Sequence, residues 1–145
     1  MRFERERRVR FSDCDPAGIA FYPQYFVMHN GFVEQWFDEG LKFPYAALIG
    51  ERRCGLPTVR LEAEFTAVSR HGDALVLAAS VARLGRSSLT LHTEFRAADG
   101  RGEQRLRLRQ VLVCISLDDH RPRELPADLR QALQACVETS TTGDS

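Results

Sequence analysis

The chain has 145 residues, of which 43% are hydrophobic and 28% are charged, a composition typical of one folded globular domain. Basic and acidic side chains number 20 each, so there is no net positive charge to attract nucleic acid or an anionic membrane surface. No apolar run approaches the roughly 20 residues that span a bilayer, and the N-terminal sequence lacks the apolar stretch of a secretory signal. We therefore expect a cytoplasmic protein with no membrane or nucleic-acid partner.

The first third of the chain is predicted to contain a strand, a turn and one long helix. Phe3 to Ser12 reads as a strand, and Asp13 to Gly18 is rich in turn-forming residues. Large side chains then recur at helical spacing, with Pro23 in the first turn of the helix and Gly40 at its end. They define one broad aromatic face, formed by Tyr22, Tyr25, Phe26, His29, Phe32, Val33, Trp36 and Phe37.

Four strand patterns follow, linked by short turns. Apolar and polar residues alternate over 59–67 and 89–96, residues 74–84 are almost wholly apolar, and a fourth strand begins at Arg105. Short turns favour antiparallel neighbours, so we expect these strands to follow one another as hairpins. In the fourth strand the inward phase changes by one residue, which predicts a β-bulge. Its inward residues are predicted to be Leu106, Leu108, Val111, Val113 and Ile115.

These elements, with a last helix over about 126–137, predict an α+β fold. One antiparallel sheet of about five strands, wrapped around the long central helix, is the simplest way to bury the aromatic face. We expect a single domain over residues 1–137 and a flexible C-terminal tail over 138–145. Such a sheet leaves two exposed edges that can pair with a second copy, so we expect at least a homodimer.

The spacing of cysteine and histidine gives no sign of a metal site. The four cysteines form no CxxC pair, and the four histidines share no metal-ligand spacing. We therefore expect free thiols and no metal. Lys42 is the only lysine, so an anionic ligand would be bound by arginine.

The segment Asp13 to Tyr25 (DCDPAGIAFYPQY) carries the residues best suited to chemistry. Two carboxylates, Asp13 and Asp15, precede the predicted helix, where unpaired N–H groups and the helix dipole favour negative charge. A carboxylate beside free amide donors supplies a nucleophile or base and an oxyanion site, as acyl transfer requires. The same residues also fit a plain helix cap, in which Asp15 binds the following amides. Asp13 is interpreted as an exposed turn residue.

The sequence DCDPAGIAFYPQYF resembles the active-site signature of the hotdog-fold acyl-CoA thioesterases, in the branch of 4-hydroxybenzoyl-CoA thioesterase. The similarity continues through the helix, Gly55-Leu56-Pro57, the hairpin at 84–88 and the segment 124–128, and so covers nearly the whole chain. It implies a hotdog fold and hydrolysis of a small aromatic, hydroxybenzoyl-like acyl-CoA to the free acid and CoA, without a cofactor. In this family a second subunit completes the pocket, which implies a homodimer that assembles into a homotetramer.

The resemblance also implies roles for individual residues. Asp15 matches the catalytic carboxylate, which attacks the thioester or activates a water, and the backbone N–H of Tyr22 matches the oxyanion donor. Arg86 matches an arginine that binds the CoA phosphates, whereas Gly85 stands where the relative has a basic residue. Asn30 replaces an aspartate that meets the substrate's 4-hydroxyl, so a different aromatic or a short aliphatic acyl group stays open. The further substrate-binding residues implied are Gly18, Pro57 and Ser88.

Two alternatives to a thioesterase stay open at this point. A hotdog protein that binds acyl-CoA without cleaving it would have no need of Asp15, and a hotdog dehydratase would pair an aspartate with a histidine in a different motif. His29 is interpreted as a packed core or pocket residue, and Glu34 as a surface or interface charge. The arginines that alternate over 105–109 are interpreted as a solvated strand face or an intersubunit surface.

Overall fold

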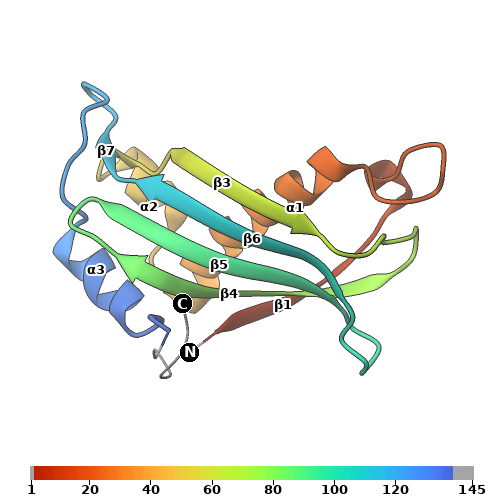
Figure 1. Cartoon of the computed structure of the whole chain (residues 1–145). Helices are drawn as coiled ribbons and strands as arrows, with labels where there is room; N and C mark the ends of the chain where they lie inside the picture. The colour runs from red at the N-terminus through yellow and green to blue at the C-terminus, as the bar shows by residue number, and fades with distance from the viewer. Residues whose placement is uncertain (1, 139–145) are drawn as a thin grey trace.

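A five-stranded antiparallel sheet wraps around one long helix in the computed structural model, which describes residues 2–138 (Figure 1). The strands of this sheet are β1 (Phe3–Arg8), β3 (Thr58–Phe65), β4 (Ala74–Leu84), β5 (Ser88–Ala97) and β6 (Gln104–Val113). Their order is β1-β4-β5-β6-β3. Short strands β2 (Cys54–Gly55) and β7 (Ile115–Ser116) pair separately. The predicted α+β architecture is confirmed.

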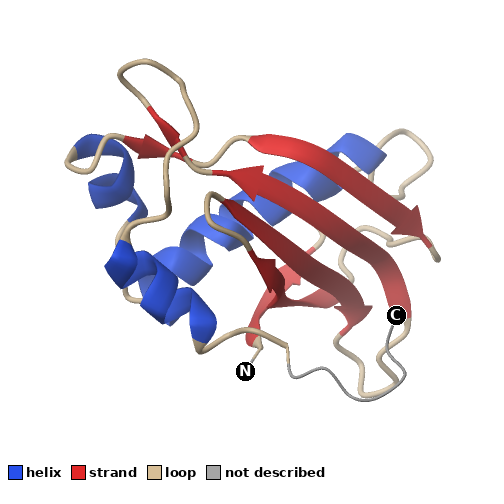
Figure 2. Ribbon diagram, turned by 60° about the vertical axis from the view of Figure 1, so that its left-hand side comes forward, coloured by secondary structure: helices blue, strands red, loops and turns tan. Residues whose placement is uncertain are grey.

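The long helix α1 (Tyr22–Gln35) packs against one face of the sheet, which curls around it (Figure 2). A π-helical turn, η2 (Trp36–Gly40), continues it and ends at Gly40 as predicted. A 3-10 turn, η1 (Phe11–Asp13), lies between β1 and α1. Two further helices, α2 (Tyr45–Gly50) and α3 (Ala127–Gln134), lie near the end of the sheet at which β4 finishes.

Burial of the aromatic helix face organises the core into two adjoining clusters. Near the start of α1 the buried residues include Tyr25, Met28, Phe32, Leu75, Leu77, Phe95, Leu106 and Leu108. Toward its end they include Val33, Trp36, Phe37, Leu48, Val81, Leu89, Leu91 and Leu112. Each such side chain contributes roughly 1.5–3 kcal/mol through its removal from water. Tyr22 departs from the predicted face, because its side chain is 59% exposed.

The strand β3 lies at the edge of the sheet beside β6, and the expectation that it forms a hairpin with β4 was wrong. β1 occupies the place beside β4, from Phe3 opposite Ala79 to Arg8 opposite Ala74. The segment 66–73 therefore crosses the end of the sheet to join β3 to β4. We call this segment the crossover. The other two predicted hairpins, β4 with β5 and β5 with β6, are confirmed.

The inward face of β6 keeps one phase along its whole length, so the predicted bulge in the middle of this strand was wrong. Leu112 and Cys114 are buried, whereas Val111 and Val113 are only half-buried. The change of phase is absent because a polar residue, Gln110, takes an inward position and bonds to a buried histidine. The register shifts that involve β6 fall instead near its start and, within β3, opposite residues 111–112 near its end.

The C-terminal part of the described chain is bound to the sheet. Val137 forms a bridge with Val81, and the Glu138 N–H donates to the Val81 carbonyl at 2.8 Å. The first residue of the predicted flexible tail is therefore hydrogen-bonded to β4, and residues 139–145 lie outside the described residues. No helix within residues 2–138 has the length and apolar character needed to cross a membrane.

Candidate active site

A tight hairpin immediately before α1 holds Asp15. Cys14 and Ala20 form an antiparallel bridge, the Asp15 N–H donates to the Ile19 carbonyl at 3.0 Å, and the Gly18 N–H donates to the Asp15 carbonyl at 2.9 Å. Gly18 closes the turn with φ of +80°, a conformation that residues with side chains rarely adopt. This segment, residues 14–20, returns the chain directly to the start of α1. We call it the Asp15 hairpin.

The half-buried carboxylate of Asp15 has one oxygen engaged and one free. Its Oδ1 accepts a hydrogen bond from the Ala17 N–H at 2.9 Å, which closes an Asx turn. Its Oδ2 has no hydrogen bond or ion pair with any residue in the described part of the chain. The turn therefore orients the carboxylate while it leaves one oxygen available to a substrate or a water.

The start of α1 leaves a backbone N–H unpaired. The N-cap is Phe21, no side chain caps the helix, and the predicted alternative of Asp15 as a helix cap was wrong. The Gln24 N–H donates to the Phe21 carbonyl at 2.8 Å, and Pro23 has no N–H. The Tyr22 N–H has no acceptor among residues 2–138. A donor at the positive end of the helix dipole is thus available to an anionic oxygen.

Asp13 differs from its neighbour, and its interpretation as an exposed turn residue was wrong. Only 5% of it is exposed, because both carboxylate oxygens contact the Arg7 guanidinium, at 3.2 and 3.3 Å. The Arg10 N–H also donates to Oδ2 at 2.8 Å. Asp13 therefore anchors the chain between β1 and the Asp15 hairpin. Burial, and then the carboxylates of Asp13 and Asp15, raise the pKa of the Cys14 thiol, so this cysteine is poorly suited to act as a nucleophile.

An aromatic cluster adjoins the start of α1. The Phe65 ring, at the end of β3, lies 6.3 Å from Tyr22, 5.8 Å from Tyr25 and 6.2 Å from Phe26, between ring centroids. The alternating pattern identified Phe65 as apolar but could not show that it meets this helix. Asn30 is exposed and lies eight residues beyond Tyr22, so Tyr22, Phe26 and Asn30 form one stripe along α1.

The seven predicted site residues fall into separate groups. At the end of the sheet where β4 begins lie Asp15, Gly18 and Tyr22. At the end where β4 finishes lie Pro57, Arg86 and Ser88. Asn30 lies between them along α1. The 11 residues of β4 span about 35 Å, so one chain does not bring these groups together.

Arg86 is held through its backbone, and its side chain is largely exposed. Its carbonyl accepts a hydrogen bond from Nη2 of Arg130 at 2.8 Å, whereas its side chain is 83% exposed and has an ion pair of 3.7 Å with Glu124. Ser88 Oγ occupies the space that a side chain at Gly85 would need. The hairpin therefore presents one arginine, on a rigid backbone, at the position predicted for phosphate binding. Sequence reasoning missed Arg130, because helical position alone does not show that it reaches this turn.

His29 is a core residue, as interpreted. It is 3% exposed, its Nε2 lies 2.8 Å from Oε1 of Gln110, and Nε2 of Gln110 donates to Thr58 Oγ1 at 2.8 Å. Within the described residues its Nδ1 has no partner. Burial lowers the pKa of His29, and the hydrogen bond with Gln110 opposes this effect only in part.

Comparison with known proteins identifies the family. Residues 9–133 match the family model described as the Thioesterase-like superfamily, and the chain belongs to this superfamily. The predicted hotdog fold and the predicted enzyme class, a thioester hydrolase, are confirmed.

Individual relatives are similar along most of their length. The chain is 30% identical over 129 residues to 4-hydroxybenzoyl-CoA thioesterase of Pseudomonas sp. (strain CBS-3), covering 85% of this chain and 91% of that protein. It is 25% identical over 132 residues to 1,4-dihydroxy-2-naphthoyl-CoA hydrolase of Synechocystis sp., covering 90% and 94%. The solved structure of a gentisyl-coenzyme A thioesterase matches with a TM-score of 0.78 and 26% identity, covering 88% and 99%.

Proposed function

We propose that this protein hydrolyses a hydroxybenzoyl-like aromatic acyl-CoA to the free acid and CoA. The observation that carries the proposal is that the segment leading into α1 holds both a carboxylate oxygen of Asp15 and the Tyr22 N–H without a partner among the described residues. The three relatives are named for different acyl groups, all of them hydroxylated aromatic rings. The cluster around Phe65 offers aromatic surface beside the same helix start, which suits such rings.

The proposed reaction uses the Asp15 carboxylate to start the attack on the thioester and the Tyr22 N–H to stabilise the charge that the attack produces. Asp15 attacks the thioester carbonyl carbon or removes a proton from a water that attacks it, and the carbonyl oxygen becomes an oxyanion. The Tyr22 N–H and the dipole of α1 stabilise this charge. The C–S bond then breaks and CoA leaves as a thiolate, which takes up the proton held by Asp15 when Asp15 is the base, or a proton from solvent when Asp15 is the nucleophile. When Asp15 is the nucleophile, water hydrolyses the resulting anhydride and restores the carboxylate. Neither route requires a cofactor.

We also propose that the active unit is a homodimer joined along β3. The apolar residues Val59, Leu61 and Phe65 of this edge strand are 61%, 40% and 49% exposed. A two-fold axis beside β3 would place the end of one sheet against the opposite end of the other. Asp15 of one subunit would then face the turn at residues 84–88, which carries Arg86, of the second subunit. Within one chain these two residues lie at opposite ends of the sheet, farther apart than the thioester and the phosphates of one CoA ester. In the dimer one CoA ester could reach both. Assembly into a homotetramer and a cytoplasmic location stay predictions.

A thiol-release assay on a panel of CoA esters tests the proposed function. The panel contains benzoyl, 3- and 4-hydroxybenzoyl, phenylacetyl, and short, medium and long straight-chain esters. We expect fastest turnover of the aromatic esters, and a fall in kcat of about 10² to 10⁴ in Asp15→Asn. Asp99→Asn is the matched control, because Asp99 forms the same Asx turn with the Arg101 N–H at 2.9 Å but lies between β5 and β6.

Each result of this assay has one meaning. Near-normal turnover in Asp15→Asn would contradict the role of this carboxylate. Preference for straight-chain esters would replace the aromatic substrate by an aliphatic one. Binding of acyl-CoA without hydrolysis of any ester would favour a non-catalytic acyl-CoA-binding protein.

A further inference from the structure

Arg105 leaves the row of exposed arginines on β6. The pairing of β5 with β6 skips this residue, which forms a β-bulge near the start of β6. Its side chain is 11% exposed, whereas Arg107, two residues on, is 54% exposed and pairs with Glu64 at 2.7 Å. A bulge redirects a side chain out of the regular alternation. The interpretation of residues 105–109 as one solvated face was therefore wrong for Arg105.

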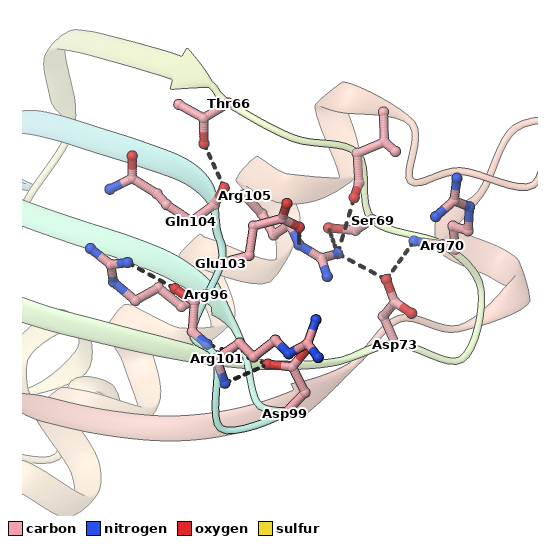
Figure 3. A network of polar contacts seen from close by, with 12 residues as sticks. Thr66, Ser69, Arg70, Asp73, Arg96, Asp99, Arg101, Glu103, Gln104 and Arg105 are labelled. Atoms are coloured by element: carbon pink, nitrogen blue, oxygen red, sulfur yellow. Dashed lines mark hydrogen bonds and ion pairs between the residues drawn. The ribbon is translucent and has the colours of Figure 1, made fainter.

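The redirected guanidinium binds the crossover, residues 66–73, as Figure 3 shows. Nη1 of Arg105 donates to the Val68 carbonyl at 3.0 Å, to Ser69 Oγ at 3.2 Å and to Asp73 Oδ2 at 2.8 Å. Its backbone carbonyl accepts the Thr66 N–H at 3.0 Å. Burial raises the pKa of Asp73, but the hydrogen bonds from Arg105 and a backbone N–H outweigh it and lower the pKa, so this partner is ionised.

The crossover in turn supports the Asp15 hairpin. Residues 69–71 pair with residues 18–20 as a short antiparallel ladder. Its contacts are the Ala20 N–H to the Ser69 carbonyl at 2.8 Å, the bridge between Ile19 and Arg70, and the His71 N–H to the Gly18 carbonyl at 3.2 Å. Asp15 is bonded to Ile19 on the other side of this ladder, and Tyr22 follows two residues after Ala20. Residues 18–20 therefore lie between the crossover, which Arg105 contacts, and the two proposed catalytic groups, Asp15 and Tyr22.

We propose that Arg105 is a positioning residue for thioester hydrolysis, an inference that rests on the proposed function of Asp15 and Tyr22. It holds the crossover, and the crossover fixes the Asp15 carboxylate relative to the Tyr22 N–H. The eight residues of the crossover lie outside the main sheet, so few backbone hydrogen bonds fix their position and the side-chain contacts of Arg105 add to them. All three contacts are made by Nη1 of Arg105, and the lysine side chain is one atom shorter, so its ammonium cannot occupy the same position without a shift of the backbone. Misplacement of reacting groups by about 1 Å can cost about 100-fold in rate.

The test compares steady-state kinetics of Arg105→Lys and Arg105→Gln with those of the parent protein, with 4-hydroxybenzoyl-CoA as the probe. We expect kcat to fall about 10- to 100-fold in Arg105→Gln, and less in Arg105→Lys, which keeps the charge opposite Asp73. KM should change by less than about 3-fold, because the side chain of Arg105 contacts the crossover and none of the residues proposed to bind CoA. Arg107→Gln, on the exposed face of the same strand, should match the parent protein.

Hydrogen exchange and folding controls separate positioning from general stability. In folded Arg105→Gln the Ala20 and His71 amides, which bond across the ladder, should exchange faster. A folded Arg105→Gln with kcat within about 2-fold of the parent value would overturn the inference. Where this variant does not fold, Ser69→Ala replaces it, since it removes one acceptor of Arg105, and an unchanged kcat would again overturn the inference. Absence of turnover in the parent protein would instead refute the proposed function.

Discussion

Two aspartates in one short segment have opposite surroundings. The Asp13 carboxylate is saturated by donors from Arg7 and Arg10, and burial makes it part of the framework. The Asp15 carboxylate is held through one oxygen only. Local sequence cannot separate the two, because either aspartate of a D-x-D segment before a helix can cap, anchor or react. The difference arises from β1, which supplies the arginine that neutralises Asp13. The resemblance, and not the spacing, identified Asp15.

At the same scale, the surroundings of His29 predict how stability depends on pH. The unfolded chain gains a proton on this histidine near pH 6.5, whereas burial holds its folded-state pKa below that value. The folded state therefore binds fewer protons, and the free energy of unfolding should fall as the pH drops below about 6.5, by at most about 1.4 kcal/mol per pH unit. Urea unfolding between pH 7.5 and 5 measures this slope.

The control for this prediction uses a non-titrating replacement. His29→Gln should flatten the dependence between pH 6.5 and 5, because glutamine can still bond to Gln110 but takes up no proton. His120→Asn changes an exposed histidine and should keep the slope of the parent protein. An identical slope in His29→Gln and the parent protein would show that the buried histidine does not contribute.

At the scale of elements, the periodicity of apolar residues predicted whether a segment forms a helix or a strand better than it predicted the neighbours of that segment in the sheet. The helix face and the bounds of β4 follow from spacing alone, because α1 and β4 bury long apolar stretches. Spacing does not predict which strand pairs with β3. Eight residues can close a hairpin, but when extended they can also cross three strand spacings of about 4.8 Å each at the sheet end. The crossover does the latter, and in doing so it meets the Asp15 hairpin.

Bulges limited the prediction of side-chain direction for a related reason. A bulge is defined by two strands together, so the sequence of β6 alone could not show that Arg105 is unpaired on β5. Gln110 is the opposite case. Its polarity suggested a break in the inward phase, although the strand continues regularly and the amide bonds to His29. Both errors concern polar residues whose partners are distant in sequence.

The exposed edge of β3 carries a prediction for assembly. Leu61→Arg should weaken the homodimer, since a charge on a half-exposed apolar position opposes burial against a second copy. We expect the dimer dissociation constant to rise about 10- to 100-fold, and kcat/KM to fall with the dimer fraction. Sedimentation velocity across a dilution series, with the assay run at the same concentrations, measures both quantities.

A matched variant guards this test against a general effect of added charge. Val27 is 62% exposed on α1 and lies beside Arg5, Arg7 and Leu77, away from β3. Val27→Arg should leave the dimer intact. Full activity in monomeric Leu61→Arg would contradict the proposal that the second subunit completes the site.

At the scale of the whole molecule, the length of β4 is the reason for proposing that two subunits share each site. This strand spans about 35 Å, the predicted residues lie in two groups near its two ends, and no side-chain motion closes such a span. Only the resemblance suggested which residues bind CoA. The sequence could not show that these residues and Asp15 lie at opposite ends of the sheet in one chain. The proposed symmetric dimer would have two equivalent sites, each with Asp15 from one subunit and Arg86 from the other.

Mixing two defective variants tests this arrangement directly. Asp15→Ala removes the proposed catalytic carboxylate, and Arg86→Ala removes the exposed guanidinium at the other end. After random exchange of equal amounts, half of the dimers contain one copy of each variant. Each such dimer has one site with both defects and one with both groups intact. About a quarter of all sites should then regain the parent kcat/KM at low substrate concentration. If both groups served the site of their own chain, mixing would restore nothing, because every site would keep one of the two defects.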